Sequence, residues 1–516
     1  MTVSQLAPVA VDVGVLSDAK DPLADDGARH AASIAAGANL DRSFARGIAW
    51  QGSVKWIVQL VTWGTTIVVA RILSPQDYGL LAMGAVLLAF IGLLSESGIG
   101  ATIVTVRGIT TEQIAQINGA AVLLGIASFT VACLAAFPVG WFYHSAALPP
   151  VIIAMSFTLV ISAFRVVPGA LLQRDLRFPR LAVLDAVQGL IQALTTVVLA
   201  TLGFRYWSLV LSALLGAAVS AAATVATRPY RFKLPRWRIL RPVLPFTRNV
   251  LVARLFWYTY QNSDFIVAGK RLGSEALGAY SYAWTLASMP IDKISALVSS
   301  VTPPIFAAVQ HDIPALRRYF LTVTEGLAVF AFPLTFGLAL VAQDLVPVVF
   351  GQRWLSMIAP LQVLAAYSTI RTITPTASQV LSVSGDTRFL MYLTGLGAFV
   401  LPTAFYIGSR WGTVGIAIAW AIAHPLAVYI PLNRRAFRRL ELPIKDYIRA
   451  LWPAVSGCLL MAAAVTLVRL SVPNISSPVR LGLEVLAGAI TYSACLMLFH
   501  RHRVASFLAI WRHRAA

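Results

Sequence analysis

The stretch DFIVAGKRLGSEALG, residues 264–278, decides the fold, because a matching stretch lies 199 residues earlier in the chain. TTIVVARILSPQDYG at residues 65–79 aligns with it, so that Gly79 meets Gly278. Each copy ends one long apolar segment and begins the next. The pair therefore indicates an internal repeat, with chance similarity between two apolar helices as the alternative.

The same offset also aligns cations. Arg71 meets Lys270, and Lys55 meets Arg254. Six apolar segments separate one copy from the next, and an even number of helices makes both units cross a bilayer in the same direction. We therefore predict two parallel repeats with a site at their interface, as in many transporters.

The composition places the repeat in a membrane. The 516 residues are 58% hydrophobic and only 12% charged, with a mean hydropathy of +0.75. Soluble domains contain roughly 45–50% apolar and about 25% charged residues. The chain is therefore an all-α polytopic membrane protein, because each segment of about 20 apolar residues must satisfy its backbone as a helix.

About fourteen segments are long enough to span a bilayer. They lie near residues 47–71, 78–99, 116–143, 150–172, 179–202, 206–227, 248–269, 277–302, 319–342, 357–383, 389–409, 412–432, 448–469 and 479–500. With this count both termini lie on one side, and most Lys and Arg residues of the connections lie on that side. The positive-inside rule makes it the cytoplasm. This placement accounts for most of the net charge of +20, so we expect no nucleic-acid partner.

The connections divide the chain into six parts. We predict a disordered cytoplasmic tail (1–44), a first lobe of six helices (45–227), a basic linker (228–247), a second lobe of six helices (248–433), a basic loop with two further helices (434–500) and a basic cytoplasmic tail (501–516). The tail has no uninterrupted apolar core, so we expect no signal peptide. The linker is either a lipid-facing loop or a hinge between the lobes, with its charges on anionic headgroups in both cases.

Ionisable side chains at membrane depth cost at least about 2.5–3.5 kcal/mol each, so each one is a functional candidate. The candidates are Lys55, Arg254, Asp264, Asp292, Lys293 and Glu325, followed by Asp185, Arg371 and Glu484. Three polar stripes accompany them at helical spacing. The first contains Gln59 near Lys55, the second contains Tyr258 and Gln261 between Arg254 and Asp264, and the third runs through Asp292.

These residue types suggest separate roles. Lys55 and Arg254 carry the donors that phosphate needs, so we predict a cationic cavity with Gln59, Tyr258 and Gln261 as further contacts. Asp264, Glu325 and Asp292 are candidate sites for a coupled H⁺ or Na⁺. Two alternatives remain: Asp264 neutralises Arg254, or the stripes only form hydrogen bonds between helices.

The sequence carries none of the motifs of the common enzyme and metal classes. It lacks a phosphate-binding GxxxxGK[ST] loop, an HExxH motif and any Cys/His cluster, so we expect no catalytic residue, metal or bound cofactor. The three cysteines lie in apolar segments and are expected to be core residues. The connections on the far side are short, which argues against a polysaccharide polymerase or ligase.

Four stretches together are similar to one family. They are GIAWQGSVKWIVQLVTWGTTIVVARILSPQDYGLLAM (47–83), LLQRDLRFPRLAVLDA (171–186), NSDFIVAGKRLGSEALGAYSYAWTLASMP (262–290) and FGQRWLSMIAPLQVLAAYSTI (350–370). They resemble the polysaccharide transporter family of the multidrug/oligosaccharidyl-lipid/polysaccharide flippase superfamily. The resemblance runs from about residue 45 to 440 and implies two six-helix lobes plus two extra helices.

The resemblance also implies a function. Such a protein would flip undecaprenyl-diphosphate-linked oligosaccharides across the bacterial inner membrane for exopolysaccharide, capsule or O-antigen synthesis, driven by H⁺, Na⁺ or the membrane potential. Its partners would be this lipid-linked substrate, membrane lipids and the polymerase and export machinery. Related flippases have a cationic cavity, which Lys55 and Arg254 fit by location. A cation-coupled drug exporter of the same superfamily is the alternative within the transporters, and acidic cavity residues would favour it.

Overall fold

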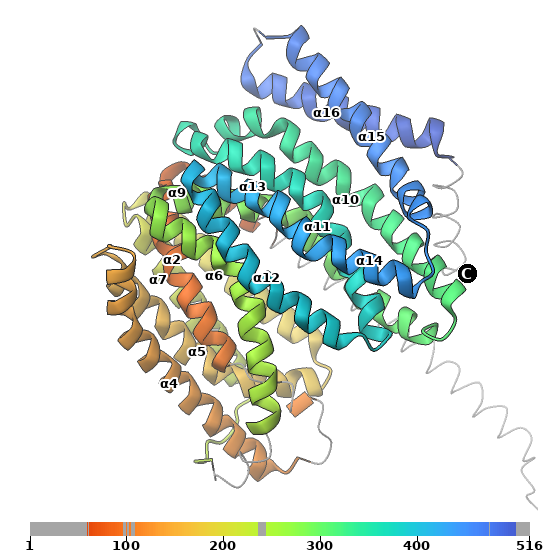
Figure 1. The fold of residues 1–516 in the computed structure, drawn as a ribbon. Helices are drawn as coiled ribbons and strands as arrows, with labels where there is room; N and C mark the ends of the chain where they lie inside the picture. Colours follow the sequence, from red (N-terminus) through yellow and green to blue (C-terminus); the bar gives the residue numbers. More distant parts are fainter. Residues whose placement is uncertain are drawn as a thin grey trace, which may run out of the picture. The chain divides into compact units, whose positions relative to one another are not determined.

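The computed structural model describes residues 59, 61–95, 100, 103–104, 109–235, 244–473 and 475–501, without the side chains of 94–95, 244–253, 293 and 295–301. The helices in this part of the chain are Val61–Ile72, α2 (Pro75–Ser95), α4 (Thr111–Phe142), α5 (Leu148–Arg174), α6 (Phe178–Thr201), α7 (Tyr206–Thr227), α9 (Leu244–Ala308), α10 (Ile313–Val349), η1 (Gln352–Met357), α11 (Ile358–Val383), α12 (Thr387–Gly408), η2 (Ser409–Trp411), α13 (Gly412–His424), η3 (Pro425–Tyr429), α14 (Ile430–Arg439), α15 (Ile444–Ser471) and α16 (Ser477–Phe499). Figure 1 shows this all-helical fold. The predicted fold class is confirmed, and the described residues of each predicted span after the first are almost entirely helical.

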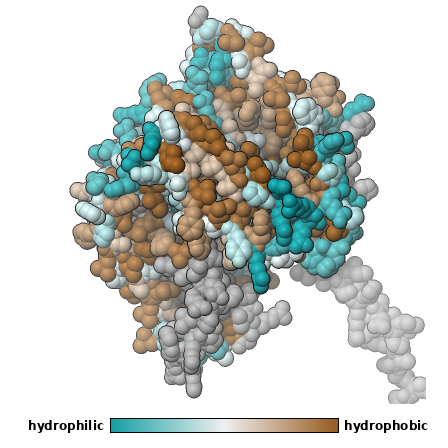
Figure 2. Space-filling model, in the orientation of Figure 1, coloured by the Kyte–Doolittle hydropathy of each residue, from teal (hydrophilic) through white to brown (hydrophobic). Residues whose placement is uncertain are grey.

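Nine helical segments of the described chain are long and apolar enough to cross a membrane. They are α2, α4, α5, α6, α7, α10, the continuous segment Thr387–Arg439, α15 and α16. Apolar side chains also cover much of the surface in Figure 2, with hydrophilic ones gathered in separate clusters. The protein is therefore a multi-pass membrane protein.

Two long helices, α9 and α11, fail this hydropathy criterion. Five of the ionisable residues that the sequence singled out lie on them: Arg254, Asp264, Asp292 and Lys293 on α9, and Arg371 on α11. Both also have helices on several sides, since α9 contacts α2, α10, α11, α12 and α13, while α11 contacts α9, α10, α13 and α14. A helix that is too polar for lipid must face protein or water. The polar helices therefore lie inside a shell of apolar ones.

Helix α9 folds back on itself at Gly273. This residue has φ 84° and ψ 179°, a conformation that glycine adopts without the steric cost of a side chain. The two halves then run side by side, because Phe265 packs its ring against both Tyr280 and Trp284, at centroid distances of 5.7 and 6.3 Å. The break falls between the predicted spans 248–269 and 277–302, so α9 comprises both.

The aligned glycines of the repeat lie at one close helix contact. A methyl group on Gly79 would come within 1.7 Å of the carbonyl oxygen of Ser274. One on Gly278 would come within 1.7 Å of the carbonyl oxygen of Pro75, which is the residue aligned with Ser274. The contact is therefore reciprocal, as in an isologous interface, where each partner offers the same residues to the other.

We predict that Gly278→Ala destabilises the folded protein by at least about 1–3 kcal/mol, because the new methyl group overlaps a backbone atom that cannot move alone. Gly482→Ala is the matched control, since no heavy atom lies within 4 Å of the Cβ position at Gly482 in α16. Thermal unfolding of the purified protein in detergent measures both. Equal midpoints for Gly278→Ala and the wild type would contradict the close contact.

The aligned cations Arg71 and Lys270 also make equivalent contacts. Arg71 donates from Nε to the carbonyl of Val349, 2.8 Å away, at the C-terminus of α10. Lys270 donates to the carbonyl of Phe142 at the C-terminus of α4. Carbonyls at helix C-termini lack intrahelical partners and carry partial negative charge, which cations offset. Each cation thus ties its own end of the repeat to the other half of the chain.

The start of the predicted linker is not a free loop. Lys233 donates its backbone N–H to Ala115 of α4 at 3.1 Å, and its ammonium lies 3.1 Å from Glu112. Tyr230 donates its hydroxyl to the carbonyl of Thr111 at 3.0 Å. Residues 228–235 therefore lie along the first turns of α4, and residues 236–243 lie outside the described part.

The last two helices are bound to α10 by ion pairs. Arg480 of α16 pairs with Asp344 of α10. Arg469 of α15 pairs with Glu484, whose side chain is fully buried, at 2.9 Å, and donates to the carbonyl of Leu340 at 2.8 Å. Glu484 is thus neutralised within the C-terminal helices, which fixes them to α10.

Candidate functional site

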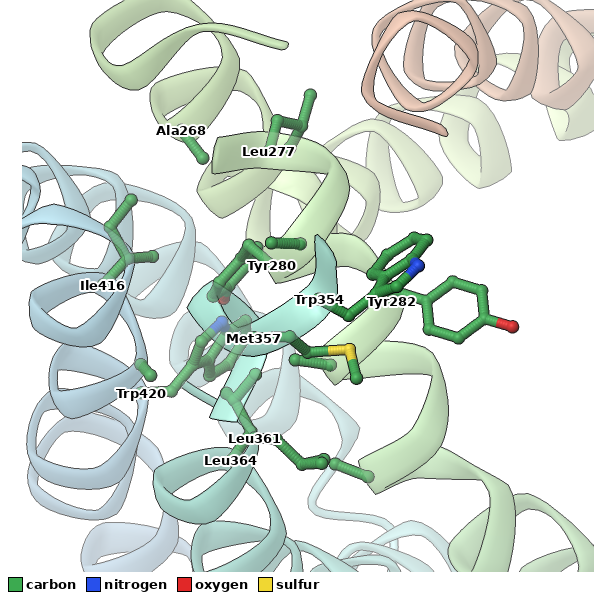
Figure 3. Packing of buried hydrophobic residues seen from close by; sticks show 14 of the residues in the cluster. Ala268, Leu277, Tyr280, Tyr282, Trp354, Met357, Leu361, Leu364, Ile416 and Trp420 are labelled. Carbon is green, nitrogen blue, oxygen red and sulfur yellow. The ribbon is translucent and has the colours of Figure 1, made fainter. Parts of the chain in front are cut away.

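Asp264 is the centre of a buried hydrogen-bond group. No part of the residue is exposed, and its Oδ2 accepts from the Tyr280 hydroxyl and the Trp420 Nε1, both at 2.8 Å. Its Oδ1 accepts the backbone N–H of Phe265 at 2.9 Å. Figure 3 shows Tyr280 and Trp420 beside each other, from α9 and α13. Three donors stabilise the carboxylate without a cation, and the group joins both halves of α9 to α13.

Asp264 does not form the ion pair with Arg254 that the sequence left open, since no such contact occurs between these two described side chains. Helix geometry gives the reason. Ten residues separate them, which is about 15 Å along the axis. The intervening Tyr258 donates its hydroxyl to the carbonyl of Val86 in α2. Six residues turn a helix by about 600°, so Tyr258 and Asp264 lie about 120° apart and face different neighbours.

Arg254 and Arg371 are half-buried guanidinium groups without a carboxylate partner in the part of the chain that the structure describes. Arg371, in the middle of α11, donates from Nη1 to the Ser288 hydroxyl at 2.8 Å and lies 4.7 Å from the centre of the Trp284 ring. A hydroxyl and an aromatic face offset only part of the cost of a buried charge. Both groups therefore favour an anion that comes from outside the chain.

The remaining predicted residues lie in different surroundings. Gln59 is partly buried, and Gln261 and Glu325 are half-buried. Asp292 is exposed, so it is not part of the buried group around Asp264. Lys55 lies outside the described residues, and its proposed place beside Arg254 stays a prediction.

A group of aromatic residues surrounds the buried carboxylate. Trp420 packs against Trp284, Tyr367 and His424, with ring centroids 5.1 to 5.8 Å apart. His424 ends α13 and is followed by a five-residue π-helix, a local form that often occurs at functional sites. Sequence reasoning missed Trp420 and His424, since an aromatic residue in an apolar segment does not differ from an ordinary core residue.

A cavity of about 450 Å³ lies between α2 and α9, with Met155 of α5 at its wall. Its volume is within the range of small-molecule sites, roughly 300–1,000 Å³. Its polar lining consists of Asn262, Ser281 and Thr285 together with tyrosines, and none of its lining residues is charged. In the described chain, no three His, Cys, Asp or Glu side chains are grouped as a metal site would need.

Comparison with known proteins agrees with this architecture. A family model described as "Polysaccharide biosynthesis protein" matches residues 68–359, more than half of the chain. The chain belongs to this polysaccharide biosynthesis family.

Two similar proteins cover most of the chain. It is 26% identical to the lipopolysaccharide biosynthesis protein WzxC of Escherichia coli K12 over 401 residues, which are 75% of this chain and 79% of that one. It is 23% identical to the succinoglycan biosynthesis transport protein ExoT of Rhizobium meliloti, over 92% of this chain and 96% of that one.

Among solved structures, the lipid II flippase MurJ in an inward closed conformation has the same fold. It matches with a TM-score of 0.71 at 12% identity, over 88% of this chain and 99% of that one. The family predicted from the four sequence stretches is thus confirmed.

Proposed function

We propose that this protein is a flippase for undecaprenyl-diphosphate-linked oligosaccharides, in the bacterial inner membrane, with both termini in the cytoplasm. Two lines of support come from the comparisons: relatives named for polysaccharide biosynthesis and transport, and the fold of a lipid II flippase. The protein would move its substrate without chemical change, for exopolysaccharide, capsule or O-antigen synthesis. Membrane lipids, the polymerase and the export machinery would be its neighbours.

One observation in the structure carries this proposal. Arg254 and Arg371 hold positive charge within polar inner helices and lack carboxylate partners among the described residues. The one carboxylate that the sequence paired with Arg254 is instead occupied by N–H and O–H donors. Such an arrangement suits an anionic headgroup, since guanidinium groups bind phosphate oxygens through several N–H donors at once.

The same charges argue against export of cationic drugs. A cation needs a carboxylate that faces its binding cavity, and no residue that lines the cavity between α2 and α9 is acidic. Asp264 has no exposed surface and is separated from solvent in this conformation. The drug exporter of the same superfamily is therefore the weaker alternative.

The energetics favour outward movement of a diphosphate. A polar headgroup without partners costs several kcal/mol in hydrocarbon, and inner polar helices remove much of that cost. An inside-negative potential contributes about 2.3 kcal/mol per charge per 100 mV to the outward movement of negative charge. A coupled H⁺ or Na⁺ would add to this, and we propose Asp264 as its site in a second conformation that opens the carboxylate to solvent.

A leaflet-specific assay of lipid-linked oligosaccharide in a deletion strain tests the function. We expect complete repeat units to accumulate in the cytoplasmic leaflet, because they are synthesised there and cannot cross. Accumulation of unpolymerised units in the outer leaflet would instead indicate a polymerase. An unchanged distribution between the leaflets would contradict the proposal.

A further inference from the structure

The lining of the cavity between α2 and α9 is uncharged, in contrast to the cationic Arg254 and Arg371. Asn262, Ser281 and Thr285 each donate one hydrogen to a carbonyl of the helix backbone. Ser281 donates its hydroxyl to the carbonyl of Gly278 at 3.0 Å, and Thr285 donates to the carbonyl of Ser281 at 2.9 Å. Asn262 donates from Nδ2 to the carbonyl of Tyr258 at 3.1 Å, which fixes the orientation of the amide.

The three polar groups therefore offer acceptor oxygens. The Asn262 Oδ1 and the two hydroxyl oxygens retain lone pairs for a ligand, and the Asn262 amide keeps one further hydrogen to donate. A diphosphate accepts hydrogen bonds and cannot donate to these oxygens once ionised. A neutral ligand that is rich in hydroxyl groups can donate to all three.

Aromatic rings form a further part of the cavity wall, and the rest of the wall is aliphatic. Tyr282 is held by Tyr78, Phe350 and Trp354, at centroid distances of 5.1, 5.3 and 4.7 Å. Figure 3 shows the Tyr282 ring beside Trp354, with its hydroxyl directed away from the rest of the cluster. Tyr78 and Phe265 supply two further rings of the wall. Rings fixed before a ligand arrives cost little ordering entropy, and their faces suit the C–H faces of a sugar ring.

The cavity and the two arginines lie at different distances along α9 from its turn at Gly273. Because α9 folds back at Gly273, distance from this turn follows from the rise of about 1.5 Å per residue. The cavity residues Asn262 and Thr285 lie about 16–18 Å from the turn. Arg254 and Ser288, which binds Arg371, lie farther from it, at about 28 and 22 Å. Along the helix axis, both arginine positions are thus farther from the Gly273 turn than the cavity is.

We infer that this cavity is a subsite for a neutral sugar residue of the lipid-linked substrate, next to a separate diphosphate subsite at Arg254 and Arg371. The inference rests on the proposed function and assigns each part of one headgroup to its own set of residues. The sugar would lie nearer the Gly273 turn, and the diphosphate would lie farther from it.

Binding to the purified full-length protein in lipid nanodiscs tests this division. The probes are undecaprenyl diphosphate and the same lipid carrying glucose, galactose or N-acetylglucosamine. We expect the wild type to bind at least one sugar-bearing lipid roughly tenfold more tightly than the bare diphosphate, which corresponds to one or two hydrogen bonds. The double variant Asn262→Leu/Thr285→Val should lose this difference and keep its affinity for the bare diphosphate. Arg254→Gln should weaken the binding of both kinds of lipid.

Thr403→Val is the matched control, because this exposed threonine of α12 also donates to the carbonyl four residues earlier and lies outside the cavity. Two results would overturn the subsite: a wild type that does not distinguish any sugar-bearing lipid from the bare one, or a double variant that loses affinity for both equally. Failure of the proposed function itself gives a different result, in which the wild type binds none of the four lipids.

Discussion

Export of polysaccharide should fall at least about 100-fold when Arg254 and Arg371 are both replaced by Gln. A hydrogen bond to a charged group contributes about 1.5–3 kcal/mol, and each 1.4 kcal/mol is a tenfold change in binding. Gln retains length and polarity but presents no charge to a diphosphate. Because neither arginine has a carboxylate partner among the described residues, their loss leaves no buried countercharge and should not unfold the protein.

The amount of polymer released per unit of protein in the membrane measures this effect. Arg410→Gln is the control, since Arg410 is an exposed arginine outside the inner helices α9 and α11. Lys55→Gln is a separate test of Lys55, which the repeat aligns with Arg254 and which the sequence predicts in the same cationic cavity. Normal export by the double arginine variant at a normal membrane level would refute the anion site.

The second large effect is expected at Asp264, as a loss of stability. Asp264→Leu removes the acceptor of two fully or almost fully buried donors, the Tyr280 hydroxyl and the Trp420 indole N–H. Each unsatisfied donor costs about 1–3 kcal/mol. The sum is a large fraction of the roughly 5–15 kcal/mol that stabilises a typical folded protein. We therefore expect a lower melting temperature in detergent and less protein in the membrane.

Asp264→Asn separates this structural role from ion coupling. The amide oxygen can still accept from Tyr280 and Trp420, and only the bond from the Phe265 N–H is lost, so the variant should fold. Export by this variant is then compared with and without a proton or sodium gradient. Loss of gradient dependence supports coupling at Asp264, and retained dependence contradicts it. Equal stability of the Leu and Asn variants would contradict the buried hydrogen-bond group.

Sequence patterns located the helices well because hydropathy and length determine what can lie in lipid. They also indicated the repeat, and in the structure the two aligned glycines, Gly79 and Gly278, lie at one close helix contact. Sequence patterns did not predict which side chains contact one another. A spacing of three or four residues drifts around a helix, so Tyr258 and Asp264 share a sequence stripe and face different neighbours.

The sequence by itself determined that this chain is a polytopic helical membrane protein, and it predicted an internal repeat and charges inside the membrane. It also indicated the family, through short stretches in a fixed order. Only the tertiary structure decided that Trp420, 156 residues away, binds Asp264, and that an uncharged cavity lies between α2 and α9. The physical reason is that helix formation depends on local backbone and side-chain properties, whereas a partner across a helix interface depends on how distant segments pack.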